Sequence, residues 1–158
     1  MMSWVPYAAT AVILVVVGAV AARATDTGPW YRNLNKPRWN PPDWMFPVVW
    51  TTIYALIILS VGRVWNQSGD VDKPMLLLVI ASNFVLNMIW SVLFFALKKP
   101  LLALFEIVLL WLSIVAMIAI FTSIDAFSGL LLIPYLSWVS VASLLNFRII
   151  TLNPGLSR

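Results

Sequence analysis

Long stretches without a charged residue are the feature that most limits what this chain can fold into. Four of these stretches contain no Asp, Glu, Lys or Arg, and they cover residues 3–22, 44–62, 74–97 and 126–147. A fifth stretch, residues 101–123, contains a single acid. A helix that crosses the hydrocarbon core of a bilayer, about 30 Å thick, needs roughly 20 mainly apolar residues. The charge gaps therefore predict five membrane-spanning helices.

The composition agrees with lipid as the solvent of most of the chain. Of 158 residues, 62% are hydrophobic and only 10% are charged, whereas a soluble domain is about one quarter charged. A closed β-barrel is a poor alternative, because barrel strands alternate apolar and polar residues and residues 105–112 are apolar at nearly every position. We therefore expect an all-α integral membrane protein, a single membrane domain over residues 1–158. Its spans are predicted at about 3–23, 44–65, 74–97, 101–123 and 126–148, with residues 24–43 as a structured first loop.

The distribution of Lys and Arg predicts how the spans cross the membrane. Eight of the ten basic residues fall on one side of a five-span arrangement, and they are Arg23, Arg32, Lys36, Arg38, Lys98, Lys99, Arg148 and Arg158. The positive-inside rule then places the N-terminus outside and the C-terminus in the cytoplasm. The net charge of +4 is thus explained by topology and lipid contact. We expect no nucleic-acid partner, which would need a basic surface on a folded soluble domain.

The predicted loop at residues 24–43 differs in composition from the rest of the chain. It contains four prolines and three aromatic residues, among them Pro41, Pro42 and Trp39. Proline fixes φ and has no N–H to donate, so the first helix cannot continue through this segment. A loop of this length is usually functional or disordered, and its aromatic content favours an ordered cap over one end of the bundle. The alternative is an interfacial anchor, in which aromatic side chains lie at headgroup level and basic ones contact anionic lipid.

The nine tryptophans fall into two groups by their position in the predicted spans. Five lie near span ends, where an aromatic belt explains them: Trp4, Trp30, Trp39, Trp44 and Trp65. Four lie inside spans: Trp50, Trp90, Trp111 and Trp138. Indole carries an N–H that lipid cannot satisfy, so a buried Trp tends to face a polar group, a water or a ligand. Four interior tryptophans together favour a cavity within the bundle.

Polar and helix-breaking residues inside the spans support the same expectation. Asn83 and Asn87 are four residues apart and share a helix face with Trp90. An amide in hydrocarbon must be satisfied, either by hydrogen bonds between helices or by a ligand, and Asn146 in the last span raises the same alternatives. Two prolines, Pro47 and Pro134, are expected to kink their helices, which can widen the space between helices.

Glu106 is the only acid inside a predicted span. Ionisable residues in the membrane are candidates for a functional role. A structural pair with a snorkelling lysine or with Arg148 is an equally good explanation. The chain also has no His and no Cys, which excludes the usual zinc sites, thiolate nucleophiles, iron–sulfur clusters and His-ligated haem. We therefore predict no metal site and no required cofactor.

Four motifs give the chain a specific resemblance. They are Trp30-Tyr31-x-x-Leu34-x-Lys36-Pro37-x-Trp39-x-Pro41-Pro42, Pro47-x-x-Trp50-x-x-x-Tyr54, Leu86-Asn87-x-x-Trp90-x-x-x-Phe94-Phe95 and Pro134-Tyr135-Leu136-x-Trp138-x-x-x-Ala142-x-x-Leu145-Asn146. With these motifs in this order, the sequence resembles the TspO/MBR family, the tryptophan-rich sensory proteins whose animal member is the translocator protein. The motifs cover residues 30–146.

The resemblance implies a five-helix bundle, commonly homodimeric, with a pocket between helices that the first loop closes. Family members bind porphyrins such as protoporphyrin IX and haem, and some bind sterols and isoquinoline or benzodiazepine drugs. By position, the pocket should include Trp39, Phe46, Trp50, Asn87, Trp90, Tyr135, Trp138 and Ala142. Flat aromatic walls suit a flat tetrapyrrole, and Arg32, Lys36 and Arg38 could attract porphyrin propionates at the mouth. The chain itself marks dimerisation weakly, through the small pair Gly18 and Ala22.

Three functions remain open from the sequence. The first is a tetrapyrrole-binding receptor or sensor with a role in porphyrin homeostasis, transport or stress regulation. The second is light-dependent breakdown of protoporphyrin IX, for which the resemblance implicates Trp50 and Trp138. The third is a transporter of sterols or other small molecules, although Phe147 stands where the animal members' sterol-recognition pattern has Tyr. A bacterial cell membrane is the expected location, with an outer or organellar membrane as the alternative.

Overall fold

The computed structural model describes residues 3–70 and 72–157, and these residues form helices and no strand. Five long helical segments, of 20 to 27 residues, are apolar enough to cross a membrane, which confirms the predicted fold class. The helices are α1 (Val5–Ala24), α2 (Pro29–Arg32), α3 (Met45–Gln67), α4 (Lys73–Ser91), α5 (Pro100–Ile124), α6 (Ala126–Leu130) and α7 (Ile133–Leu152), with a π-turn η1 (Val92–Ala96) and a 3₁₀ turn η2 (Pro154–Ser157). Arg158 lies outside the described residues.

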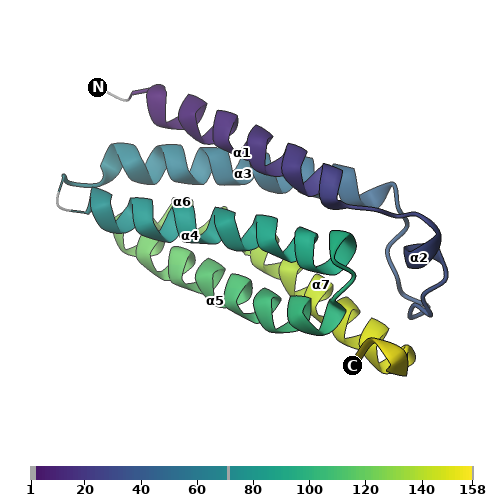
Figure 1. The fold of residues 1–158 in the computed structure, drawn as a ribbon. Coiled ribbons are helices and arrows are strands. Elements are labelled where there is room, and N and C mark those ends of the chain that lie inside the picture. The colour runs from purple at the N-terminus through teal and green to yellow at the C-terminus, as the bar shows by residue number, and fades with distance from the viewer. Residues whose placement is uncertain (1–2, 71, 158) are drawn as a thin grey trace.

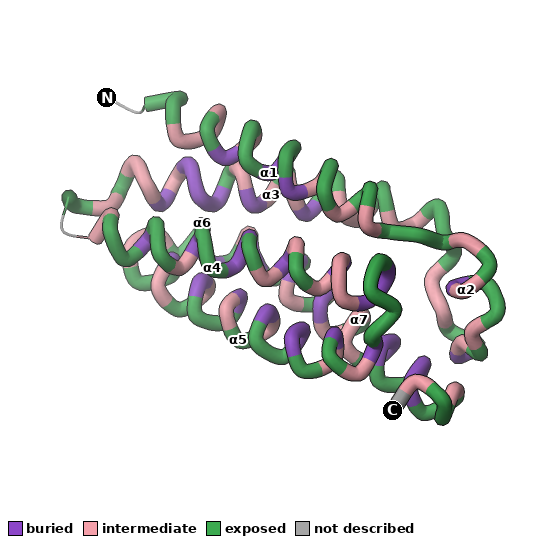
Figure 2. Tube along the Cα trace, viewed as in Figure 1, coloured by how far each residue is buried: buried purple, intermediate pink, exposed green. Residues whose placement is uncertain are grey.

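The long helices pack in an order that differs from their order in the chain. Helix α1 packs against both α3 and α4, α4 packs against α5, and α5 packs against α7. The N- and C-terminal ends lie at opposite ends of the bundle, and the loop that carries α2 lies at the C-terminal end (Figure 1). Buried positions face the interior on all five long helices, and most outward positions are exposed (Figure 2). An apolar outer surface of this kind is what lipid solvates.

The last span is divided into two helices. Helix α6 ends at Leu130 and α7 begins at Ile133, so a two-residue break replaces the continuous helix expected over residues 126–148. Pro134 is the second residue of α7, a position where the missing N–H costs nothing. Pro47 is likewise in the first turn of α3, where backbone N–H groups have no intrahelical partner. The prediction of an interruption is therefore wrong for Pro47, whereas the last span is interrupted next to Pro134, by a break between two helices.

The turn between α5 and α6 is fixed by Asp125. Its carboxylate pairs with Arg63 of α3 at 3.0 Å and accepts a hydrogen bond from the backbone N–H of Ser128 at 3.2 Å. The hydrogen bond from Arg63, with those from Ser128, holds the pKa of Asp125 below its ordinary value. This ion pair ties α3 to the start of the last span, at the end of the bundle away from α2 (Figure 1).

Amide side chains connect the helices in the interior. Asn83 donates a hydrogen bond to Ser113 Oγ of α5 at 2.8 Å, and its Oδ1 accepts one from the Tyr135 hydroxyl of α7 at 3.3 Å. Asn87 donates to the same hydroxyl at 3.0 Å. When the amide of Asn146 is oriented to suit its neighbours, it accepts from Leu104 N and donates to the Pro100 carbonyl, both at 3.1 Å. All three asparagines thus join helices, which is one of the two roles that the sequence left open.

The π-turn η1 allows both of two successive aromatic residues to be buried. Phe94 and Phe95 are 3% and 7% exposed, although neighbouring residues of an α-helix point about 100° apart. Both rings contact Tyr31, with centroids 6.5 Å and 5.4 Å away. The wider turn therefore presents two rings to the loop above the bundle. A π-turn gives no simple sequence signal, and the sequence did not predict it.

The capping loop, residues 25–44 with α2 inside it, is ordered and attached to the bundle. Asn35 N donates to Asn153 Oδ1 at 3.0 Å, and Asn153 Nδ2 donates to the Asn35 carbonyl at 2.9 Å. The Tyr31 side chain, 6% exposed, inserts into the cluster that contains Phe94 and Phe95. These contacts show a cap rather than a mobile linker. Trp39 and Trp44, at 49% and 66% exposed, remain available as interfacial anchors.

Candidate functional site

A cavity of about 420 Å³ lies beneath the capping loop. Its walls come from α1, α3, α4, η1 and α7. The lining residues are Gly18, Ala21, Ala22, Thr25, Thr27, Tyr31, Asp43, Phe46, Pro47, Trp50, Tyr54, Asn87, Trp90, Ser91, Phe95, Trp138 and Ala142. Small-molecule sites commonly enclose about 300 to 1,000 Å³. The cavity is therefore large enough for an organic ligand.

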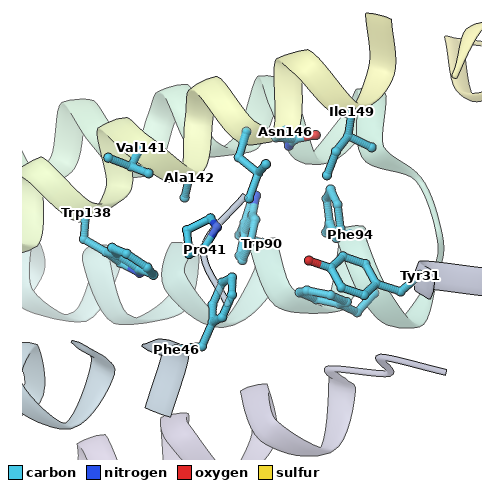
Figure 3. A pocket seen from close by; sticks show the side chains of 12 residues that line it. Tyr31, Pro41, Phe46, Trp90, Phe94, Trp138, Val141, Ala142, Asn146 and Ile149 are labelled. Atoms are coloured by element: carbon cyan, nitrogen blue, oxygen red, sulfur yellow. The ribbon is translucent and has the colours of Figure 1, made fainter. Parts of the chain in front are cut away.

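Aromatic side chains from three helices form the walls of the cavity. Phe46 and Trp138 meet edge to face, with ring centroids 5.6 Å apart, and they join α3 to α7. Trp50 lies 5.5 Å from the ring of Tyr54 on its own helix. A smaller void of about 20 Å³ adjoins the main cavity and shares six of its lining residues. Figure 3 shows Trp138, Phe46 and Trp90 around this region, with Pro41 of the capping loop between them.

Small residues on α1 leave the space that the aromatic rings enclose. Gly18, Ala21 and Ala22 line the cavity on this helix. A side chain on Gly18 would begin 3.0 Å from Cε2 of Tyr54, so this glycine faces α3 of its own chain. Gly18 therefore contributes to the cavity, and it is not evidence for a helix pair between two copies.

The indole nitrogens around the cavity lack hydrogen-bond partners. Among the described residues, no group accepts a hydrogen bond from Nε1 of Trp50, Trp90 or Trp138, whereas Nε1 of Trp111 donates to Ser140 Oγ at 2.9 Å. Trp111 does not line the cavity. Of the four tryptophans predicted to lie inside spans, three line the cavity, and the fourth, Trp111, joins α5 to α7.

The mouth of the cavity is polar, and its one charged lining residue is an acid. Thr25, Thr27 and Asp43 are exposed and line this region. The three basic residues expected there do not line the cavity. Lys36 Nζ donates to the Tyr31 carbonyl and lies 4.3 Å from the Tyr31 ring centroid.

Lys36 and Arg32 are held within the capping loop. Arg32 Nε donates to the Thr27 carbonyl at 3.2 Å. Burial lowers the pKa of Lys36, and the charge of Asp43 partly opposes this effect. Arg38 is exposed. Arg32 and Lys36 therefore stabilise the cap and Arg38 lies on its surface, and none of the three lines the cavity.

Most of the pocket residues expected from the sequence do lie together. Six of the eight line the cavity, and these are Phe46, Trp50, Asn87, Trp90, Trp138 and Ala142. Tyr135 is 1% exposed and lies behind Trp50, with ring centroids 6.2 Å apart, so it supports the wall. Trp39 lies on the loop surface. The pocket predicted from the sequence leaves out the small-residue face of α1, together with Tyr54, Ser91 and Phe95. Tyr54 follows Trp50 by four residues, and that spacing places it on the same helix face.

The fold and the cavity define a class of protein: a small five-span membrane protein with a ligand-sized aromatic cavity beneath an ordered first loop. The sequence matches the TspO/MBR family over residues 8–152. The chain therefore belongs to the TspO/MBR family.

Individual relatives agree with this assignment. The chain is 42% identical over 129 residues to "Protein CrtK" of Rhodobacter capsulatus, a match that covers 81% of each chain. It is 43% identical over 129 residues to "Tryptophan-rich protein TspO" of Chlorobaculum tepidum, covering 79% of this chain and 80% of the relative. It is 29% identical over 149 residues to "Translocator protein" of Bos taurus, covering 92% of this chain and 88% of the relative.

Proposed function

We propose that the cavity binds a tetrapyrrole, metal-free protoporphyrin IX in preference to haem, and that the protein is a membrane receptor or sensor in porphyrin homeostasis, transport or stress regulation. The size of the cavity and its aromatic walls support this proposal. Offset and edge-to-face contacts between aromatic rings contribute about 0.5 to 1.5 kcal/mol each beyond the burial of area. A flat conjugated ligand gains such contacts from several walls at once.

The observation that carries the proposal is the pair of free indole nitrogens on facing helices. Trp50 of α3 and Trp138 of α7 line one cavity, and their N–H groups have no partner within the described part of the chain. Neither nitrogen is among the fully buried unpartnered atoms, so each N–H is accessible to an acceptor on a bound ligand. A ligand with peripheral oxygen or nitrogen acceptors can form these hydrogen bonds, and a purely hydrocarbon ligand cannot.

The preference for a metal-free porphyrin follows from the donor atoms in the chain. Haem iron in proteins is usually held by His, Cys, Met or Tyr, and the chain has no His and no Cys. The lining side chains that remain as axial ligands are the hydroxyls of Tyr31 and Tyr54. We expect haem to bind through its ring rather than through its iron.

A fluorescence titration tests the proposal. Purified protein in detergent is titrated with protoporphyrin IX, and the quenching of tryptophan emission gives the affinity. Trp138→Ala should weaken binding by about tenfold, which corresponds to about 1.4 kcal/mol. Trp111→Phe is the matched control, since Trp111 bonds Ser140 outside the cavity, and it should bind like the wild type. Equal affinity for Trp138→Ala and the wild type would contradict the proposal.

A second candidate is light-dependent breakdown of bound protoporphyrin IX. It is favoured by the presence of Trp50 and Trp138 in the same cavity, because indole is readily oxidised and both rings would contact an excited porphyrin. Illuminated Trp50→Phe/Trp138→Phe protein should then retain porphyrin absorbance that the wild type loses. Identical spectra for the two proteins would exclude this function and leave simple binding.

Other properties are proposed on the same basis. Sterols and isoquinoline or benzodiazepine drugs are further candidate ligands of the apolar walls, and a homodimer is the proposed assembly. Basic residues such as Arg32 and Lys98 lie at the end of the bundle that carries the capping loop. By the positive-inside rule, this end is the cytoplasmic one. This gives an outside N-terminus in a bacterial cell membrane.

A further inference from the structure

Three of the buried polar atoms without a partner belong to just two side chains of the membrane helices. Among the described residues, the side-chain atoms that are fully buried and unpartnered are Asn40 Oδ1, Trp90 Nε1 and both carboxyl oxygens of Glu106. Asn40 lies in the capping loop, whereas Trp90 and Glu106 lie on α4 and α5. One of these two residues can only donate a hydrogen bond, and the other carries two oxygens that can accept one.

Glu106 has no charged partner. It is 7% exposed, and the ion pairs among the described residues are Arg63 with Asp125 and Lys73 with Asp70. The pair with a lysine or with Arg148 that the sequence suggested is therefore not formed. A buried polar group without a hydrogen bond is costly, and a carboxyl inside a membrane helix is otherwise rare. Such a group needs a partner that the protein itself does not supply.

The register of α4 and α5 brings Trp90 and Glu106 to the same level. These helices run antiparallel (Figure 1), and Asn83 of α4 bonds Ser113 of α5 at 2.8 Å. Seven residues are about two helical turns, so Trp90 lies two turns beyond Asn83 on the same face. Glu106 lies two turns before Ser113 on the facing side of α5.

The buried residues beyond this pair agree with the register. Phe94 of η1 and Ala103 of α5 belong to one buried cluster, and the ring of Trp90 packs against that cluster. The indole of Trp90 stacks on Phe94, with centroids 5.5 Å apart. The register set by Asn83 and Ser113 therefore places Trp90 opposite Glu106 across the interface, and no direct hydrogen bond joins the two side chains.

We propose that Trp90 and Glu106 form an occluded polar site between α4 and α5 that holds one hydroxyl oxygen, that of a water molecule. The indole N–H donates to this oxygen, and one of its O–H groups donates to a carboxyl oxygen of Glu106. A buried water of this kind typically makes about three hydrogen bonds to groups that are otherwise unsatisfied. A single bridging oxygen thus gives the Trp90 indole and one oxygen of the Glu106 carboxyl a hydrogen-bond partner.

The site lies behind the wall of the large cavity. The ring of Trp90 lines the large cavity and also the smaller void beside it, which Figure 3 shows, while its Nε1 is fully buried. The bridging oxygen therefore fixes the orientation of one aromatic wall. The inference is independent of the tetrapyrrole proposal, because it concerns the protein without any ligand in the cavity.

Nuclear magnetic resonance of the full chain in detergent micelles tests the site. The indole N–H groups are observed in protein labelled with ¹⁵N-tryptophan, and Trp90→Phe assigns the Trp90 signal. We expect magnetisation transfer from the water resonance to the Trp90 indole proton. Glu106→Leu should abolish this transfer and shift the Trp90 signal. Glu106→Gln keeps an oxygen acceptor, so the transfer and the position of the Trp90 signal should stay as in the wild type. The Trp111 indole, bonded to Ser140, is the internal control and should not change.

Two outcomes would overturn the proposal. The first is absence of transfer from water in the wild type. If Glu106→Leu then shifts the Trp90 signal, Trp90 and Glu106 are in direct contact without a water; if it does not, the two side chains do not interact. Transfer from a detergent or lipid hydroxyl, in place of water, would show that the site takes its oxygen from an amphiphile. If Glu106→Leu does not fold, the wild-type transfer together with Glu106→Gln still decides the question.

Discussion

Removal of the Asn153 side chain should loosen the capping loop by an amount that the structure allows us to calculate. Asn153 and Asn35 exchange two hydrogen bonds, of 3.0 Å and 2.9 Å, that join the loop to the end of α7. A net hydrogen bond contributes about 0.5 to 1.5 kcal/mol. Both bonds are at exposed positions, so we take the lower limit and expect Asn153→Ala to cost about 1 kcal/mol. That free energy corresponds to about a fivefold increase in the open population of the loop.

Hydrogen–deuterium exchange of the protein in micelles measures this opening. Backbone amides of the capping loop should exchange about fivefold faster in Asn153→Ala, because exchange from locally opened states follows the population of those states. Asn33→Ala is the matched control, since the Asn33 side chain is exposed and makes no hydrogen bond in the described structure. Unchanged exchange in Asn153→Ala, or equal acceleration in the control, would refute the assignment of Asn153 as the attachment point of the loop.

Two further predictions concern the stability of the bundle. Tyr135→Phe removes the hydroxyl that two asparagine amides of α4 share. It should lower the free energy of unfolding in micelles by about 1 kcal/mol, a value typical of hydrogen bonds between membrane helices and of buried hydrogen bonds. Ser137→Ala loses only a hydrogen bond within α7 and should have little effect, so an equal loss of stability in the two variants would contradict the role of the asparagine–tyrosine network. Asp125→Asn removes the partner of Arg63. Because the pKa of Asp125 is lowered in the folded protein, its stabilisation is complete above the ordinary carboxyl range and is lost as the pH falls below that range. The variant's melting temperature should therefore fall less than that of the wild type on acidification, and parallel pH profiles would refute this.

The main features of the fold could be predicted from the sequence because lipid imposes a simple rule. An apolar segment of about 20 residues without a charged side chain has few alternatives to a membrane-spanning helix. The breaks within spans were harder to predict. The division between α6 and α7 depends on where Pro134 falls relative to a helix start, and the π-turn η1 depends on the packing of Phe94 and Phe95 against Tyr31. Neither is a property of a local stretch of sequence.

The site was partly predictable for a similar reason. Aromatic residues inside spans indicated the walls, but a cavity also requires the absence of side chains. The sequence marked Gly18 and Ala22 only as a small pair for helix association, and it gave no sign that they line a cavity. The orientation of Tyr135 away from the cavity follows from its bonds to Asn83 and Asn87 on another helix. Such long-range contacts are set by the three-dimensional register of the helices.

Cavity filling tests most directly whether the cavity beneath the capping loop is the binding site. Ala142 lines the cavity on α7, and Ala142→Phe should occupy the space beside Trp138 while leaving every indole in place. We expect the affinity for protoporphyrin IX, measured by fluorescence titration, to fall about tenfold or more, as the loss of one aromatic contact of about 1.4 kcal/mol requires. Ala116→Phe, at an exposed position of α5, is the matched control and should bind as the wild type does. Unchanged affinity in Ala142→Phe would contradict the account and place the porphyrin elsewhere on the protein.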